Sequence, residues 1–396
     1  MTIKHASIVP LIGGETLGQI NAFGTRPEYL LSYSAFIDND SHLVNYLKDV
    51  PYILLDQGGK APYYVDVVNS VCPCAGLSSL SGYAHSDAAA NEWMYRTTEY
   101  VLKEIKPKVF WGENAPTFAG KLGKPIVDKL HAIAKAEGYT MSIYRTKSFL
   151  HGLPQVRERS FYFFWKGNKV PLLNYYSTPI QTIEQLLDNI DRKSTQWESR
   201  LNETPSKHDP LYRYVLEELE GGITHKDFYN MITKTDNPMD WLERKGIKYT
   251  EVAQWLRKNN YDTMAERCER MHTKLESGGN IMRRPTMVPK DFIGAFVGHY
   301  PKWMTHYSED RYITYRESMS IMGLPEDFEL LQPYKFFNHV CQNVPVGTAT
   351  DMANEIKAVL NDERDWLNGD LLYQYNASKR HELKDSSPPS CLSSFI

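Results

Sequence analysis

The chain has 396 residues, with 45 lysines and arginines against 48 aspartates and glutamates, and 42% of its residues are hydrophobic. This composition excludes a mainly disordered protein, and at roughly 100 to 200 residues per domain the length predicts two or three domains. The near-neutral charge argues against a uniformly basic nucleic-acid binder, but it leaves open a local basic face.

The sequence also limits where the protein acts. No stretch approaches the roughly 18 consecutive apolar residues that a membrane helix needs, so we expect no association with a membrane. The N-terminal apolar run is broken by Pro10 and is poor material for a signal peptide, which favours a cytoplasmic protein. Five cysteines at low density do not indicate a disulfide framework. We further expect a monomer.

Short apolar runs alternate with helical stretches over the first 168 residues. The apolar runs are 6–12, 29–37, 65–71, 108–111, 140–144 and 160–165, and helical spacing marks 91–105 and 125–137. Repeated strand and helix units predict an α/β fold with a doubly wound, mostly parallel sheet. Such sheets bind ligands at the carboxyl ends of their strands.

From residue 169 to about 300 the chain becomes more polar and helix-like, which predicts a second domain or a large insertion. The helix-like segments are 182–197, 211–220, 249–258 and 261–275. The segment from Trp241 to Lys290 contains eleven lysines and arginines and six aspartates and glutamates. This excess fits a nucleic-acid contact or a solvated helix face. Helices are predicted at 315–322 and 346–360, and the polar tail from Ser378 is expected to be loose.

Two cysteines follow the apolar run at 65–71, in the order Cys72-Pro73-Cys74. A cysteine just past a strand end lies where α/β enzymes place catalytic groups, and its thiolate is the reactive form. A buried structural thiol and a metal ligand are the alternatives. Zinc would need further ligands at regular spacing, and none stands nearby, so we expect no metal site.

Two further clusters lie at or near strand ends. Glu113 and Asn114 follow the run at 108–111, and Arg157 and Arg159 alternate along an emerging strand. Considered alone, Glu113 could be a solvated acid, and the two arginines could be a pair of surface cations. Together with Cys74 they could bring a nucleophile, an acid and a fixed cation to one substrate.

In order and spacing these clusters resemble the cytosine-C5 DNA methyltransferase family. The family's nucleophile motif corresponds to Pro73-Cys74-Ala75, its acid motif to Glu113-Asn114-Ala115 and its arginine motif to 155–159. Its glycine turn corresponds to Ile12-Gly13-Gly14, its TxRE motif to 313–328 and its GNxVPV motif to 342–346. The resemblance covers nearly the whole chain outside 169–310 and the tail. It implies a Rossmann-like catalytic domain of 1–168 plus 330–365, an inserted smaller target recognition domain of 169–329 and a C-terminal tail of 366–396.

The resemblance also implies a mechanism. Cys74 would add to C6 of cytosine, Glu113 would act at N3, Arg159 would contact O2, and Arg157 would be a neighbour of less certain role. The target base must be flipped out of double-stranded DNA, which the family does with a mobile loop after the cysteine. That loop corresponds to residues 76–87, where Ser78 and Gly82 are expected near DNA and Gly82 is a candidate hinge.

The methyl donor implied by the resemblance is S-adenosylmethionine. The residues expected to bind it are Ile12, Gly13, Gly14, Phe36, Asp38, Asp56, Pro73, Gln342, Asn343 and Val344. The family pattern is broken around this site, because Val9 and Leu11 replace a phenylalanine and a glycine, Phe36 stands at an acidic position, and Cys72 replaces a proline. A repacked adenine pocket with Phe36 stacking is one explanation. The others are a donor analogue with a changed alkyl group, an inactive relative or an RNA substrate.

For recognition of DNA, the segment around Gly278-Gly279 joins a flexible backbone to the paired cations Arg283 and Arg284. Arginine can read guanine or hold phosphate, so we expect both arginines near DNA, with an ordinary surface loop as the alternative. The role suggested by the resemblance is restriction and modification or the self-protection of a phage. A catalytically silent DNA-binding protein is the competing function.

Overall fold

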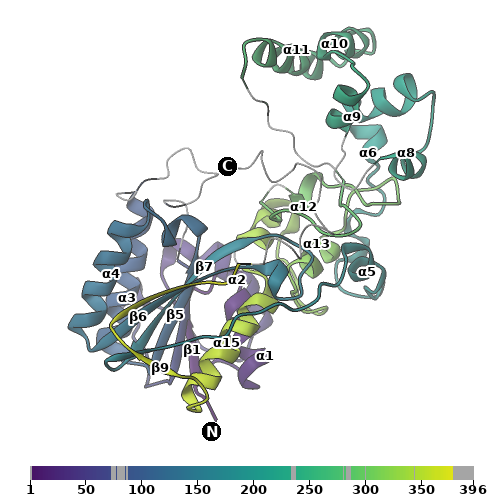
Figure 1. The fold of residues 1–396 in the computed structure, drawn as a ribbon. Coiled ribbons are helices and arrows are strands. Elements are labelled where there is room, and N and C mark those ends of the chain that lie inside the picture. The colour runs from purple at the N-terminus through teal and green to yellow at the C-terminus, as the bar shows by residue number, and fades with distance from the viewer. Residues whose placement is uncertain are drawn as a thin grey trace. The chain divides into compact units, whose positions relative to one another are not determined.

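The computed structural model describes residues 2–72, 77, 85, 88–232, 238–279, 281, 287–298, 300–342 and 344–377. The chain forms two compact units (Figure 1). The described residues of the sheet unit lie in 2–181, 294–298 and 319–377, and those of the helical unit lie in 182–293 and 300–318.

An eight-stranded sheet forms the centre of the sheet unit. Its strands are β1 (His5–Ile8), β2 (Leu30–Ser32), β3 (Tyr52–Leu54), β4 (Val67–Ser70), β5 (Val109–Asn114), β6 (Tyr139–Lys147), β7 (Glu158–Lys166) and β10 (Leu371–Tyr375). They lie in the order β10-β6-β7-β5-β4-β1-β2-β3; β7 runs antiparallel to β5 and β6, and the other pairings are parallel. This confirms the predicted doubly wound, mostly parallel sheet. Chain order reverses between β1 and β4, which is the point where such sheets bind ligands.

Helices cover both faces of the sheet (Figure 1). The two helices α1 (Gly14–Phe23) and α15 (Val346–Leu360) lie on one face, and α3 (Glu92–Tyr100) and α4 (Lys124–Ala136) lie on the other. Both faces of β7 are therefore apolar: Phe161, Phe163 and Trp165 belong to the α15 side of the core, and Tyr162 and Phe164 to the α4 side. Two shorter helices, α2 (Ile37–Tyr46) and α14 (Pro333–Phe336), complete the unit, and β8 (Lys169–Pro171) pairs with β9 (Trp366–Asn368).

The helical unit is built from short helices. They are α5 (Ile183–Asp188), α6 (Pro205–His208), α7 (Pro210–Tyr214), α8 (His225–Met231), α9 (Pro238–Arg244), α10 (Tyr249–Lys258), α11 (Asp262–Glu276) and α12 (Tyr300–Trp303), while α13 (Tyr315–Ile321) crosses into the sheet unit. A buried ion pair between Arg311 and Glu317, 2.8 Å from nitrogen to oxygen, ties the start of α13 to the preceding loop. Among the described residues, we find no helix with the length and hydropathy needed to cross a bilayer.

Several predicted elements end earlier than expected. The run 6–12 is a strand only to Ile8, because Val9 and Leu11 take positive φ angles of 51° and 50°. The run 29–37 is a strand only to Ser32, because the Asp56 carboxylate accepts the Ser34 N–H at 3.0 Å and draws the chain into a turn. The helix predicted over 182–197 ends at Asp188.

The unit boundaries also differ from the domain boundaries expected from the sequence. Residues 169–181, 294–298 and 319–329 lie in the sheet unit, not with the inserted region. The described part of the expected tail contains β9 and β10, and β10 pairs in parallel with β6 at the edge of the sheet. Residues 366–375 therefore complete the sheet unit.

Candidate active site at the carboxyl ends of the strands

A buried acid and a cation meet at the end of β5. The Glu113 carboxylate lies 3.2 Å from Nε of Arg159 on β7, and their side chains are 3% and 16% exposed. Burial raises the pKa of the Glu113 carboxyl, while Arg159 and then Arg157 hold it down. The structure thus brings together two of the residues expected from the sequence, in a site where water screens their charges little.

Arg157 takes a different position from Arg159. Its side chain is buried, and its two terminal nitrogens donate to the carbonyl oxygens of Phe296 and Cys341 at 3.0 and 2.9 Å. It therefore ties the start of β7 to two segments that come from far along the chain. Its guanidinium is held by main-chain oxygens, although its charge still acts on Glu113.

The turn after β1 has an unusual backbone. Gly13 has a φ of 94°, and a Cβ at this position would lie 2.5 Å from a Leu43 methyl carbon in α2, so glycine is required. Leu11 also has positive φ, which is strained for a side chain of this kind. Its N–H donates to Asp40 at 2.9 Å, a buried carboxylate that also accepts hydrogen bonds from Ser32 and Tyr52.

Asp40 was not expected from the sequence. The only signal for it is an acidic residue at the fourth position of a helix that begins after the second strand. Burial raises its pKa to about 7, and its three hydrogen-bond donors oppose that shift. The network explains how a leucine can stand where the resembling family has a glycine, because it fixes the conformation that glycine would adopt freely.

Phe36 belongs to an aromatic cluster beside this turn. Its ring meets the Trp93 ring edge-on with centroids 4.9 Å apart, and Trp93 lies equally close to the Tyr33 ring. The Arg96 guanidinium lies over Tyr33, 4.7 Å from the ring centroid. Sequence reasoning identified Phe36 alone, since Tyr33 and Trp93 are 60 positions apart and only the fold joins them.

The other described candidates for cofactor binding are spread around the same strand ends. Asp38 is exposed on α2 and lies 3.8 Å from Lys335. Asp56 holds the Ser34 turn, and the Gln342 side chain accepts a hydrogen bond from Asn39 at 2.5 Å. Val344 is buried in the core on the α15 side, and Ile12 is also buried. The described structure therefore brings Gly13, Phe36 and Asp56 to adjacent strand ends but uses Val344 in packing.

Cys72 and Tyr162 form part of a second buried polar group. The Cys72 thiol lies 3.1 Å from the Ser70 hydroxyl, and burial raises its pKa to about 11. The Tyr162 hydroxyl is close enough to Cys72 to raise its own pKa further, and Gly112 leaves the room that the Tyr162 ring occupies. Cys72 is a protonated core thiol, which accounts for it at a position where the resembling family has proline.

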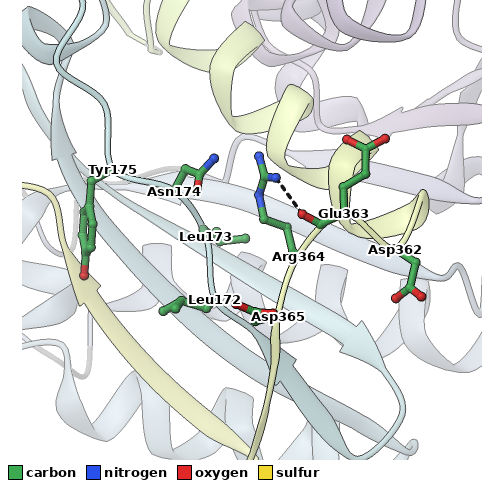
Figure 2. Close-up of a pocket in the computed structure, with 8 residues that line it drawn as sticks. All are labelled: Leu172, Leu173, Asn174, Tyr175, Asp362, Glu363, Arg364 and Asp365. Atoms are coloured by element: carbon green, nitrogen blue, oxygen red, sulfur yellow. Dashed lines mark hydrogen bonds between the residues drawn. The ribbon is translucent and has the colours of Figure 1, made fainter.

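Several candidates fall outside the described residues. They are Pro73, Cys74, Ser78, Gly82, Arg283, Arg284 and Asn343. Figure 2 shows a cavity of about 480 Å³ elsewhere in the sheet unit, where residues 172–175 run beside residues 362–365. Its lining includes none of the expected site residues, and Arg364 at its wall is held by Glu355 at 2.7 Å.

Comparisons with known proteins identify the family and the fold. The family model described as C-5 cytosine-specific DNA methylase matches residues 50–358. A solved structure of a protein described as a DNA modification methyltransferase encoded within a prophage (E. coli) is 15% identical, with a TM-score of 0.58 over 91% of this chain and 99% of that one. The Entamoeba histolytica methyltransferase EhMeth is 10% identical, with a TM-score of 0.55 over 92% and 100%. No relative was found among curated proteins.

At these identities the solved structures establish the fold, a mostly parallel sheet of the Rossmann-like methyltransferase type. The family model spans more than half of the chain and includes Glu113, Arg157 and Arg159. The resemblance seen in the sequence is thereby confirmed. The chain belongs to the C-5 cytosine-specific DNA methylase family.

Proposed function

We propose that this chain methylates C5 of a cytosine flipped out of double-stranded DNA, with Cys74 as nucleophile, Glu113 as acid and Arg159 as the fixed cation. The observation that carries the proposal is the buried Glu113–Arg159 pair, 3.2 Å apart at the carboxyl end of β5. Family membership gives the reaction class, and the geometry of this pair supports the roles that we propose for Glu113 and Arg159.

The Cys74 thiolate adds to C6 and forms the S–C6 bond, while the electron pair of the C5=C6 double bond shifts to C5 and is delocalised toward N3 and O2. C5 thereby becomes nucleophilic enough to attack a methyl group. The C5 proton then leaves to a base, and the S–C6 bond breaks to release the thiolate. Cys72 cannot replace Cys74 in this role, because its thiol stays protonated near neutral pH.

Glu113 and Arg159 stabilise the charge that this addition pushes into the ring. A protonated Glu113 carboxyl donates to N3, and the raised pKa of that group favours the protonated form. Arg159 lies beside Glu113 and contacts O2, where it meets the same developing negative charge. Arg157 supports both by fixing the start of β7.

S-adenosylmethionine, which a methyltransferase family uses generally, supplies an electrophilic methyl group when bound. The residues present fit this donor. The Gly13 turn leads into α1, Phe36 and Trp93 offer aromatic surface for an adenine ring, and Asp38 is an exposed carboxylate for ribose hydroxyls. Ile12, Gly14, Asp56, Pro73, Gln342 and Asn343 would complete the surroundings. The Leu11–Asp40 bond accounts for the missing glycine without a change of donor, which supports S-adenosylmethionine itself as the donor.

The remaining assignments concern DNA and biological role. The helical unit would recognise the target sequence, with Arg283 and Arg284 near DNA, while Ser78 and Gly82 belong to the loop that follows Cys74 and helps flip the base. The prophage origin of one structural relative supports a phage or restriction-modification role. We propose a cytoplasmic monomer.

The test is to express the chain in cells that lack cytosine methylation and to read their DNA at base resolution. The expected result is 5-methylcytosine at one short sequence motif, and its loss when Cys74 is replaced by alanine. Unmodified DNA together with 5-methylcytosine in transfer RNA would contradict the DNA substrate.

A further inference from the structure

Glu15 is a buried carboxyl group that directly follows the Gly13-Gly14 turn. It lies in the first turn of α1 and is fully buried. Among the residues that the structure describes, neither carboxylate oxygen has a hydrogen bond of normal geometry, and no ion pair reaches it. Burial, followed by repulsion from Glu113, raises the pKa of Glu15 well above its usual value.

The groups around Glu15 place it between two parts of the active site. Asn69 on β4 lies beside it and favours the ionised form, although Asn69 Nδ2 also lacks a hydrogen bond of normal geometry. The titratable groups that face it are Glu113 on β5, the Cys72 thiol past β4 and the Tyr162 hydroxyl on β7. Glu15 therefore lies between the turn expected to hold the methyl donor and the acid expected to hold the cytosine.

A buried acid in this position lowers the stability of the folded protein unless a hydrogen-bond or ion-pair partner compensates for it. A buried polar group without a partner destabilises a protein by about 1–3 kcal/mol, and more when it is charged. Among these neighbours only the Asn69 amide favours the ionised form, since Glu113 is itself acidic and burial keeps Cys72 and Tyr162 protonated. No ion pair between Glu15 and a cation is seen among the described residues, so a bound cationic ligand would supply the opposite charge that the carboxylate lacks.

We propose that Glu15 is the counter-ion of the sulfonium centre of S-adenosylmethionine, so that the protein distinguishes this cationic donor from its neutral thioether product. The inference rests on the proposed function for the identity of the donor. The N-terminus of α1 carries a partial positive charge, which suits an anion and disfavours a bare cation. A carboxylate in the first turn reverses that preference at the place where the transferred group must pass to cytosine.

The proposal has a proton-linked consequence. Burial, and then repulsion from Glu113, raises the pKa of Glu15 in the free protein and so favours its protonated form. A bound cation favours the carboxylate, so binding releases the Glu15 proton to solvent. Affinity for S-adenosylmethionine then increases with pH until Glu15 is ionised in the free protein as well. A neutral thioether causes no such release.

The experiment is isothermal titration calorimetry on the full chain with three ligands. They are S-adenosylmethionine, sinefungin, which carries an amine near the sulfonium position, and the neutral S-adenosylhomocysteine. For Glu15→Gln we expect about tenfold or more weaker binding of the two cationic ligands and less than a twofold change for the neutral one. Glu137→Gln, at a partly exposed residue that follows the last turn of α4, is the matched control and should change none of the three.

The wild-type chain alone gives a second measurement, which does not depend on how the variant folds. Binding enthalpies in buffers of different ionisation enthalpy should reveal proton release with S-adenosylmethionine and none with S-adenosylhomocysteine. Equal weakening of all three ligands by Glu15→Gln, or equal proton release by wild type with both donor and product, would overturn the proposal. Wild type that binds none of the three would instead contradict the proposed donor.

Discussion

Asp40 accepts a hydrogen bond from the Leu11 main-chain N–H at 2.9 Å and so holds the turn after β1 in a conformation that leucine rarely adopts. A left-handed backbone is unfavourable by roughly 1–2 kcal/mol for such a residue. A hydrogen bond contributes about 0.5–1.5 kcal/mol, and more when its acceptor is charged, which offsets much of this strain. The pairing lets the chain keep a glycine-like turn without the glycine.

This network predicts a distinct pH dependence for Asp40→Asn. In the folded protein the pKa of Asp40 is raised to about 7, so the native state holds a proton that the unfolded chain releases at lower pH. The free energy of unfolding of wild type, relative to Asp40→Asn, should therefore fall as pH rises from about 4 to about 7, by up to roughly 4 kcal/mol, and then stay level. Urea unfolding of both proteins across this pH range measures the difference in their free energies of unfolding. A difference that is constant across this range would contradict the raised pKa.

Cys72→Ala should leave catalysis intact. The thiol is a buried core group whose pKa lies near 11, so we expect a loss of about 1 kcal/mol in the free energy of unfolding and methylation activity within a factor of about two. Cys74→Ala is the matched comparison and should abolish activity with little change in stability. Loss of activity in the Cys72 variant at unchanged stability would show that this thiol takes part in the reaction.

Glu113→Gln should change the pH profile as well as the rate. The proposed mechanism needs a protonated Glu113, so kcat/KM of wild type should decline as pH rises through the pKa of that carboxyl. Glutamine has no such titration, and we expect the declining limb to disappear along with a loss of about 10²–10⁴ in kcat/KM. Steady-state methylation across the pH range measures both effects. A declining limb that survives in the variant must come from another group.

Arg157 and Arg159 should separate stability from catalysis. The compact lysine ammonium lacks the planar fork that reaches both carbonyl oxygens, so we expect Arg157→Lys to lose one of the two main-chain hydrogen bonds and roughly 1–3 kcal/mol in the free energy of unfolding. Arg159→Lys should retain most stability and lower kcat/KM by about 10²-fold. Unfolding and kinetics measured on both variants test the division. The opposite pattern would mean that Arg157 is the cation that contacts cytosine.

The sequence predicted the parts of this molecule that depend on local pattern. Alternating apolar runs located six strands of the sheet, and motif order identified Glu113 and Arg159, which the fold then brings within 3.2 Å. It did not predict where strands end. The strand β2 ends at Ser32 because of a contact with the distant Asp56, and β1 ends at Ile8 because positive φ angles follow it. Short strands such as β3 and β10 gain stability from neighbours and have little periodicity of their own.

The site residues that sequence reasoning missed share one property. Asp40, Glu15 and Trp93 matter through burial and through partners elsewhere in the chain, and neither can be read from spacing. Glu15 directly follows the glycine-turn motif, but acids are common in the first turn of a helix. Only its complete burial in the fold distinguishes it from such acids. Cys72 was an unexplained departure in sequence and becomes a core thiol in the fold.

The most direct test of the central claim is covalent trapping on a DNA duplex that contains 5-fluorocytosine at the target base, with S-adenosylmethionine present. Fluorine at C5 blocks the release step, so the adduct between enzyme and DNA should persist through denaturation. We predict a stable complex for wild type and for Cys72→Ala, and none for Cys74→Ala. Absence of a complex with wild type, or a complex that survives in Cys74→Ala, would contradict the account.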